Sequence, residues 1–282
     1  MGTEYNDPNN HIQLLEKPPA TWKGIVCVTG GVFLMIYLGC FFLWGNIATY
    51  VLSYFWYIDD DLSYDFIFLV DTFLIISNWI GYQVGVYLFM TLGINQRIVI
   101  GLGGFISLAG VFFSSFTKTL FAYLSFYCVF NGIGCGMCYF VALICAWEWF
   151  PTKKGLVTGV TLGGYGFGSF IFAQISTKLV NPTGENPEPL DPDNPDVNYF
   201  TRDVADRVPF MIRTLVYIWA VLVTIAVILI NRRPKDYRNE EGTQMLNGQH
   251  VSTEFDRESV DTNEKKVNNT VLSAAPTEPT DA

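Results

Sequence analysis

Charge is the property that this sequence lacks most clearly. Only 15% of its 282 residues are charged, while 50% are hydrophobic, against roughly 25% charged residues in ordinary soluble domains. The charges gather in the two ends of the chain and in a few loops, which leaves long stretches with none. An ordinary soluble fold is therefore excluded, because such stretches offer no surface to water.

Residues that commonly build catalytic or metal sites are also scarce or out of place. The two histidines, His11 and His250, lie in the polar ends of the chain. No carboxylate pair shares a helix face, and no nucleophile has a recognisable base beside it. We therefore expect no enzyme, no metal site and no other cofactor. The net charge of −9 comes from acidic loops and the tail, and it argues against nucleic acid as a partner.

The cysteines do not form the framework of a secreted, disulfide-bonded protein. All six lie in apolar stretches, at Cys27, Cys40, Cys128, Cys135, Cys138 and Cys145. The Cys135-x-x-Cys138 pair has the spacing of a redox or metal motif, but both histidines are far away. We expect these cysteines to be small packing residues between membrane helices.

Six apolar stretches are long enough to cross a membrane, since a spanning helix needs about 20 mostly apolar residues. They occupy residues 24–58, 66–95, 98–147 (two spans divided by a polar turn at 114–119), 155–177 and 208–231. We expect an all-α membrane protein with a six-helix domain over residues 22–233, inserted in a lipid bilayer. It follows a polar amino terminus, residues 1–21, and precedes a polar tail, residues 234–282, that we expect to be disordered.

Basic residues next to the spans predict that both ends of the chain lie in the cytoplasm, because cytoplasmic loops are rich in Lys and Arg. On the side of the termini these residues are Lys17, Lys23, Arg97, Lys153, Lys154, Arg232, Arg233, Lys235 and Arg238. The opposite side carries Lys118, Lys178, Arg202 and Arg207, together with many acidic residues. The loop over 181–207 on that side is rich in Pro, Asp and Asn, so we expect it to be irregular and exposed.

Small and polar residues mark particular helix faces. Glycines recur at four-residue spacing at Gly81 and Gly85, at Gly132 and Gly136, and at Gly155, Gly159 and Gly163. Because small residues let helices approach closely in lipid, we expect the second, fourth and fifth helices to pack tightly, in a static or a sliding interface.

Ionisable and amide side chains inside the spans leave alternatives open. Asp71 shares a stripe with Asn78 on the second helix, and it could face a cavity or simply reach interfacial water. Asn131 lies on a small, weakly polar face of the fourth helix, which suits a substrate passage and also helix packing. Arg213 in the sixth helix could snorkel to the interface or pair with an acidic group.

The most specific segment joins the fourth and fifth helices. It reads WFPTKKGLVTG from Trp149 to Gly159 and continues as GGYGFG from Gly163 to Gly168. It resembles the signature of the monocarboxylate-transporter and oxalate/formate-antiporter branch of the major facilitator superfamily, which has an aromatic pair, a basic pair, and then Leu and Gly-rich spacing. The matching residues are Trp149, Phe150, Lys153, Lys154, Leu156, Gly159, Gly163 and Gly164. Trp44-Gly45-Asn46 resembles the same branch more weakly.

The resemblance covers residues 22–233, which correspond to the amino-terminal half of a twelve-helix fold. Gly93 and Arg97 match a gating motif between the second and third helices, but Met90 and Thr91 stand where an Asp and a basic residue would be expected. The resemblance also implies that cationic residues for the substrate carboxylate lie largely in the other half.

The implied function is transport of a small organic anion, monocarboxylate or oxalate/formate-like, by alternating access, in a subunit built from two inverted three-helix repeats. Two copies of this chain, or this chain with a partner half, would enclose a passage lined by the first, second, fourth and fifth helices. Our candidates for polar contacts along it are Asn46, Asn78, Asn131, Tyr165 and Asp71, although Asn is often only a link between helices. The alternative is a truncated, non-transporting protein with a regulatory or structural role in a larger complex.

Overall fold

The computed structural model describes residues 21–58, 66–189 and 198–234. Within these ranges every extended element is helical, and six helices are long and apolar enough to cross a membrane, as predicted. The described residues up to Arg232 form one compact unit. The expectations for the first 20 residues and for the tail beyond residue 234 lie outside the described residues.

Each membrane span consists of one to three consecutive helical elements, and the first three spans are built as follows. The first contains α2 (Thr21–Leu38), the 3₁₀ segment η1 (Gly39–Leu43) and α3 (Trp44–Trp56). The second contains α4 (Phe66–Val86) and the π segment η2 (Tyr87–Thr91), and the third is α5 (Gln96–Ser114).

The last three spans show the same construction. The fourth contains α6 (Leu120–Tyr123), the π segment η3 (Leu124–Phe130) and α7 (Asn131–Trp149). The fifth contains the 3₁₀ turn η4 (Pro151–Lys153) and α8 (Lys154–Val180), and the sixth contains α9 (Arg202–Ala205) and α10 (Val208–Leu229).

The turn between the second and third spans shows how local sequence ends and starts a helix. Gly93 adopts φ +65°, a left-handed conformation that costs glycine little. Two residues later the Asn95 side chain accepts a hydrogen bond of 2.9 Å from the Arg97 backbone N–H and caps α5.

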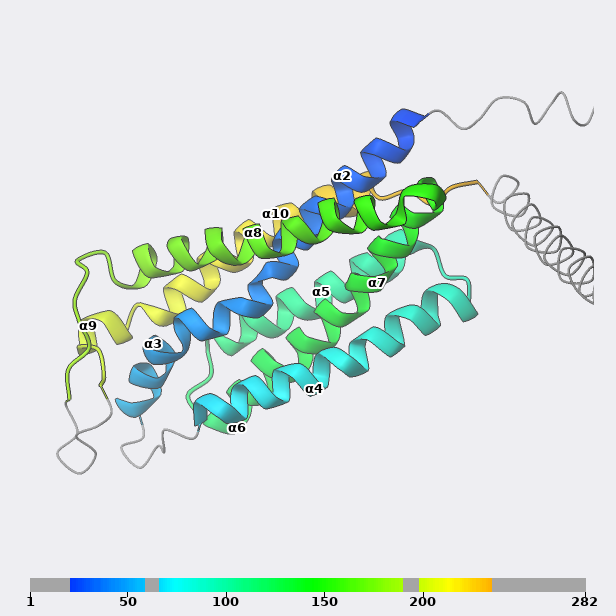
Figure 1. Ribbon diagram of the computed structural model, residues 1–282. Helices are drawn as coiled ribbons and strands as arrows, with labels where there is room; N and C mark the ends of the chain where they lie inside the picture. The colour runs from blue at the N-terminus through cyan, green and yellow to red at the C-terminus, as the bar shows by residue number, and fades with distance from the viewer. Residues whose placement is uncertain (1–20, 59–65, 190–197, 235–282) are drawn as a thin grey trace, which may run out of the picture. The chain divides into compact units, whose positions relative to one another are not determined.

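Helix packing follows a scheme in which the two halves of the domain play equivalent parts (Figure 1). Helix α2 packs on α8 and α10, α7 packs on α4 and α5, and α5 meets α10. The first span corresponds to the fourth, the second to the fifth and the third to the sixth. Under this exchange the α2–α8 contact becomes the α7–α4 contact, and the α2–α10 contact becomes the α7–α5 contact. This pattern of contacts is the one expected of two three-helix repeats.

Glycines make the closest of these contacts possible. A Cβ at Gly136 would collide with the Asn78 carbonyl across the α4–α7 contact, and a Cβ at Gly168 would collide with the Ile36 carbonyl across the α2–α8 contact. The expected close packing of the second and fourth helices is therefore confirmed.

The glycines at the start of the fifth span behave differently. Gly155, Gly159 and Gly163 have no atom within 4 Å of the position of a Cβ. The fifth helix therefore does not join the close packing of the second and fourth helices that we expected. This stripe faces outward, and α8 approaches α2 through Gly164 and Gly168 instead.

The loop between the fifth and sixth spans is more ordered than we expected where the structure describes it. Tyr199 and Glu188 exchange backbone hydrogen bonds of 2.8 and 2.9 Å. Both Tyr199 and Phe200 are buried, and their rings stack on Trp56 and Tyr50. This part of the loop thus caps the end of α3, whereas Asp191, Asp193 and Asp196 lie outside the described residues.

Arg213 neither pairs with a described carboxylate nor stays isolated. Its Nε donates to the Pro209 carbonyl at 3.0 Å, and its guanidinium lies 5.3 Å from the centre of the Phe116 ring. The cation is therefore held near the start of α10 by a backbone oxygen and an aromatic face.

Candidate functional site

Four spans surround a hollow of about 270 Å³ within the described part of the bundle. Phe41 and Phe42 come from η1 and Tyr139 and Tyr165 from α7 and α8, while α4 contributes Ile75, Asn78, Trp79 and Tyr82. These are the first, second, fourth and fifth spans, the set that we expected to line a passage.

Helix periodicity and close packing bring the polar residues of α4 to this hollow. Asn78 and Tyr82 lie one turn apart on the same face. Gly81 between them lies against the α7 backbone, where a Cβ would collide with the Ile133 carbonyl. The close approach of the two helices places the Tyr82 ring 5.3 Å from the Tyr139 ring.

The aromatic side chains continue from α7 to α8 and the first span. The Tyr139 and Tyr165 rings are 6.0 Å apart, and the Tyr165 and Phe42 rings are 5.1 Å apart. Both pairs meet edge to face, a favourable arrangement for aromatic rings. The wall is thus a series of aromatic rings with three phenol hydroxyls, from Tyr82, Tyr139 and Tyr165.

The hydroxyls of this wall can donate to a ligand. Asn78 Nδ2 donates to the Tyr82 hydroxyl over 3.4 Å, which leaves the hydroxyl hydrogen of Tyr82 available. The hydroxyls of Tyr139 and Tyr165 have no hydrogen-bond partner among the described residues. Asn78 itself is buried, and its Oδ1 has no partner in the described structure. No charged side chain lines the hollow, so any charge in it would be met by neutral donors.

Asn131 lies away from the hollow, in the contact between α2, α5 and α7. Its Oδ1 accepts hydrogen bonds from Ser107 Oγ at 2.6 Å and from Cys135 Sγ at 3.3 Å. The Tyr37 hydroxyl in turn donates to Ser107 Oγ at 2.5 Å. All four residues are buried, so the structure places Asn131 and Cys135 in a helix-packing network.

The other two candidates also lie outside the hollow. Asn46 Oδ1 accepts hydrogen bonds of 3.2 Å from both Ser176 and Thr177, and so links α3 to the last turns of α8. Asp71 is exposed on α4, and it makes no hydrogen bond or ion pair with another described residue. Of the five candidates for polar contacts, the structure brings together Asn78 and Tyr165.

One residue of the signature segment, Trp149, belongs to a cluster at the end of the bundle where α7 and α10 finish. Trp149 Nε1 donates to the Asn231 carbonyl at 2.7 Å, and Arg97 at the start of α5 donates to the Asn231 side chain. Glu148 pairs with Arg232 at 2.9 Å. We call these five residues the terminal brace, since they join α5, α7 and the end of α10.

The remaining signature residues take no part in the terminal brace. Lys153, Lys154 and Leu156 are exposed. Gly164 packs on α2, where a Cβ would lie 2.8 Å from the Val32 carbonyl, and Phe150 lies against Gly24.

Sequence reasoning missed most of the aromatic wall. Tyr82 belongs to the polar stripe of α4, but Phe41, Trp79 and Tyr139 carry no comparable signal, because aromatic residues are frequent throughout the spans. The one usable hint is their position beside glycines that bring two helices together.

The six apolar spans and the membrane transporters among its relatives define a multi-pass integral membrane protein. The chain is 27% identical to "Apicoplast pyruvate carrier 1" of Toxoplasma gondii, with 74% of this chain and 46% of the relative covered. It is 34% identical to the "Oxalate:formate antiporter" of Oxalobacter formigenes over 32% of this chain and 21% of the relative. "Monocarboxylate transporter 12-B" of Danio rerio is 31% identical over 31% of this chain and 18% of the relative.

These similarities agree with the resemblance carried by the signature segment. The homologues include carriers of the monocarboxylate and oxalate/formate branch of the major facilitator superfamily. No protein-family model matches the sequence. The chain spans about half the length of the Toxoplasma carrier and smaller shares of the other two.

Proposed function

We propose that this chain transports a small organic anion, of the monocarboxylate or oxalate/formate kind, by alternating access. The observation that supports this most is the hollow between the first, second, fourth and fifth spans, whose wall presents phenol hydroxyls. Relatives named as a pyruvate carrier, an oxalate:formate antiporter and monocarboxylate transporters support the substrate class.

The chemistry of the wall suits one side of a carboxylate. Hydrogen bonds from neutral donors to a charged acceptor contribute about 1.5–3 kcal/mol each, and the aromatic rings would shield them from water. A second half, or a second copy of this chain, would close the passage and supply the cationic residues. This chain and the second half would then rock around the site, while the terminal brace holds one end of this bundle.

Uptake by the full chain in proteoliposomes tests the proposal. Radiolabelled pyruvate, lactate, oxalate and formate are the probes. We expect Tyr82→Phe and Tyr165→Phe to lower uptake about tenfold, because each removes one donor to a charged group. Tyr217→Phe is the matched control, since Tyr217 is 65% exposed on α10, away from the hollow, and it should transport like the wild type.

The alternative function is a regulatory or structural role without transport. It is favoured by the absence of any cationic side chain among the residues that line the hollow. In this case folded wild-type protein would take up none of the four anions, either alone or after co-reconstitution with a second half. Equal uptake by the wild type and both tyrosine variants would instead remove the hollow from the proposed mechanism.

A further inference from the structure

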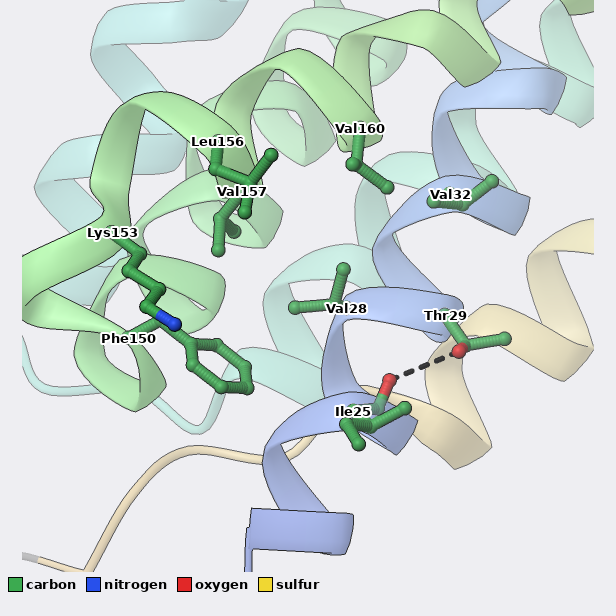
Figure 2. A pocket seen from close by; sticks show the side chains of 9 residues that line it. All are labelled: Ile25, Val28, Thr29, Val32, Phe150, Lys153, Leu156, Val157 and Val160. Carbon is green, nitrogen blue, oxygen red and sulfur yellow. Dashed lines mark hydrogen bonds between the residues drawn. The ribbon is translucent and has the colours of Figure 1, made fainter.

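A second cavity lies between α2 and α8, at the same end of the bundle as the terminal brace. It has a volume of about 490 Å³, within the range of about 300–1,000 Å³ of small-molecule sites. Figure 2 shows the side chains of Ile25, Val28 and Val32 on α2 facing Leu156, Val157 and Val160 on α8. We call this cavity the α2–α8 groove; it is separate from the aromatic hollow.

The walls of the groove are almost entirely apolar. The Thr29 hydroxyl is engaged within α2, since it donates to the Ile25 carbonyl at 2.9 Å (Figure 2). Leu156 and Ile25 are 66% and 57% exposed. These residues lie within predicted membrane spans, so the open side of the groove faces hydrocarbon or another apolar surface.

One end of the groove is basic. Lys153 is the charged residue of its lining, and it stands with Phe150 at the start of the fifth span (Figure 2). Lys154 follows directly, and both lysines are exposed. No described carboxylate pairs with either lysine, because Glu148, the nearby acidic residue of α7, is engaged by Arg232.

We propose that the α2–α8 groove binds an anionic phospholipid, with an acyl chain between the two helices and the phosphate at Lys153 and Lys154. Basic pockets between membrane helices recognise anionic headgroups, and each lysine strengthens such binding by about fivefold. The apolar lining of the groove matches an acyl chain, and the lysines at its end match the phosphate of the headgroup. A neutral helix of another protein would fill the groove but leave both lysines unpaired.

The bound lipid would join the first and fifth spans where they do not touch directly. A Cβ at Gly31 would lie 3.3 Å from the Thr161 side chain, so the helices meet from that level onward. Nearer the terminal brace, the acyl chain would fill the space between them. This inference does not depend on the proposed transport function.

Native mass spectrometry of the full chain in detergent, titrated with phosphatidylglycerol or phosphatidylcholine of equal chain length, provides the test. We expect the wild type to retain phosphatidylglycerol preferentially. Lys153→Gln/Lys154→Gln should weaken that lipid by about 25-fold and abolish the preference. Val160→Trp, which fills the groove, should weaken both lipids.

Matched substitutions control for altered charge and bulk elsewhere. Lys118→Gln/Lys178→Gln removes two exposed lysines from other loops and helix ends, and Val221→Trp enlarges a 60% exposed valine on α10. Both controls should bind like the wild type, and elution on size exclusion verifies that each variant is folded.

Three results would overturn the proposal. Equal retention by all variants would show adventitious lipid only. A loss confined to the lysine variant, with Val160→Trp unchanged, would show simple surface attraction without use of the groove. Full competition by inorganic phosphate would show an anion site that needs no acyl chain.

Discussion

Polar side chains inside the bundle differ in how fully they are paired. Asn131 accepts two hydrogen bonds from Ser107 and Cys135, whereas Asn78 keeps an oxygen without a partner in the described structure. Buried polar groups normally find partners, so an unpaired one marks either strain or a place for a ligand. We therefore interpret the amide of Asn131 as a structural link between helices. We interpret the amide of Asn78 as part of the candidate site.

Asn131→Ala should destabilise the folded bundle by about 1–2 kcal/mol, because it leaves the Ser107 hydroxyl without its acceptor. Asn46→Ala is the control with a smaller effect, since Asn46 is exposed and its hydrogen bonds are long. All six cysteines are buried, so a thiol-reactive dye reports unfolding directly. An intact melting temperature combined with lost uptake would instead return Asn131 to the substrate passage.

The sequence predicted two residues of the hollow, Asn78 and Tyr165, and could not select the others. An amide side chain in a membrane helix is rare enough to draw attention. However, an Asn that lines a substrate passage and an Asn that links two helices look alike in a sequence. Which use applies depends on how a helix is rotated against its neighbours. Asn78 reaches the hollow because Gly81 and Gly136 bring α4 against α7. The glycine spacing predicts this contact, but it does not predict the rotation of α4 that places Asn78 at the hollow.

At the scale of elements, the same glycine spacing has two different outcomes. Gly164 and Gly168 pack against the α2 backbone. A Cβ at Gly155, Gly159 or Gly163 would have no neighbouring atom within 4 Å. The spacing predicts that a helix can be approached closely, but not by which neighbour or whether that neighbour belongs to the same chain.

Substitution of single glycines separates these two outcomes. Gly168→Ala should cost about 1–3 kcal/mol, because the added methyl group would collide with the Ile36 carbonyl. Gly159→Ala should be neutral or slightly stabilising in a helix, since the methyl group meets open space. Thermal unfolding of both variants in detergent measures the difference, and an equal loss for both would contradict the assignment of faces.

The terminal brace gives a second prediction at this scale. Arg232→Gln should destabilise the end of the bundle by about 1–3 kcal/mol, since it removes the ion pair between Arg232 and the mostly buried Glu148 carboxylate. The Glu148→Gln/Arg232→Gln double variant should recover part of this loss, because the uncompensated charge is gone. A double variant as unstable as the sum of both single variants would mean that the two residues do not act as a pair.

The spans themselves were predictable because the bilayer imposes their length and composition on the sequence. The predicted ends of the spans differ from the observed ends by only a few residues. The fourth span was predicted to end at Trp147, and α7 ends at Trp149. The 3₁₀ segment at Gly39–Leu43 and the π segments were not predicted. Such adjustments follow from packing, in this case of Gly39 against the α8 backbone.

At the scale of the whole molecule, the two ends of the helix bundle differ in charge. The end with the terminal brace carries Lys23, Arg97, Lys153, Lys154 and Arg232, and Glu148 is its described carboxylate. The described residues of the opposite end mix both signs, including an ion pair of 3.9 Å between Arg202 and Asp206. By the enrichment of basic residues on the cytoplasmic side, the brace end should face the cytoplasm.

Cysteine labelling in intact cells tests this orientation. The six native thiols are buried, so an impermeant maleimide should label a cysteine introduced at an exposed position and little else. We expect Lys118→Cys to react in intact cells and Lys154→Cys to react only after permeabilisation. The opposite pattern would invert the topology, and it would also move the lysines of the α2–α8 groove to the other leaflet. Since anionic lipids are concentrated in the cytoplasmic leaflet of cells, the same experiment decides whether the groove meets the lipid that its charge requires.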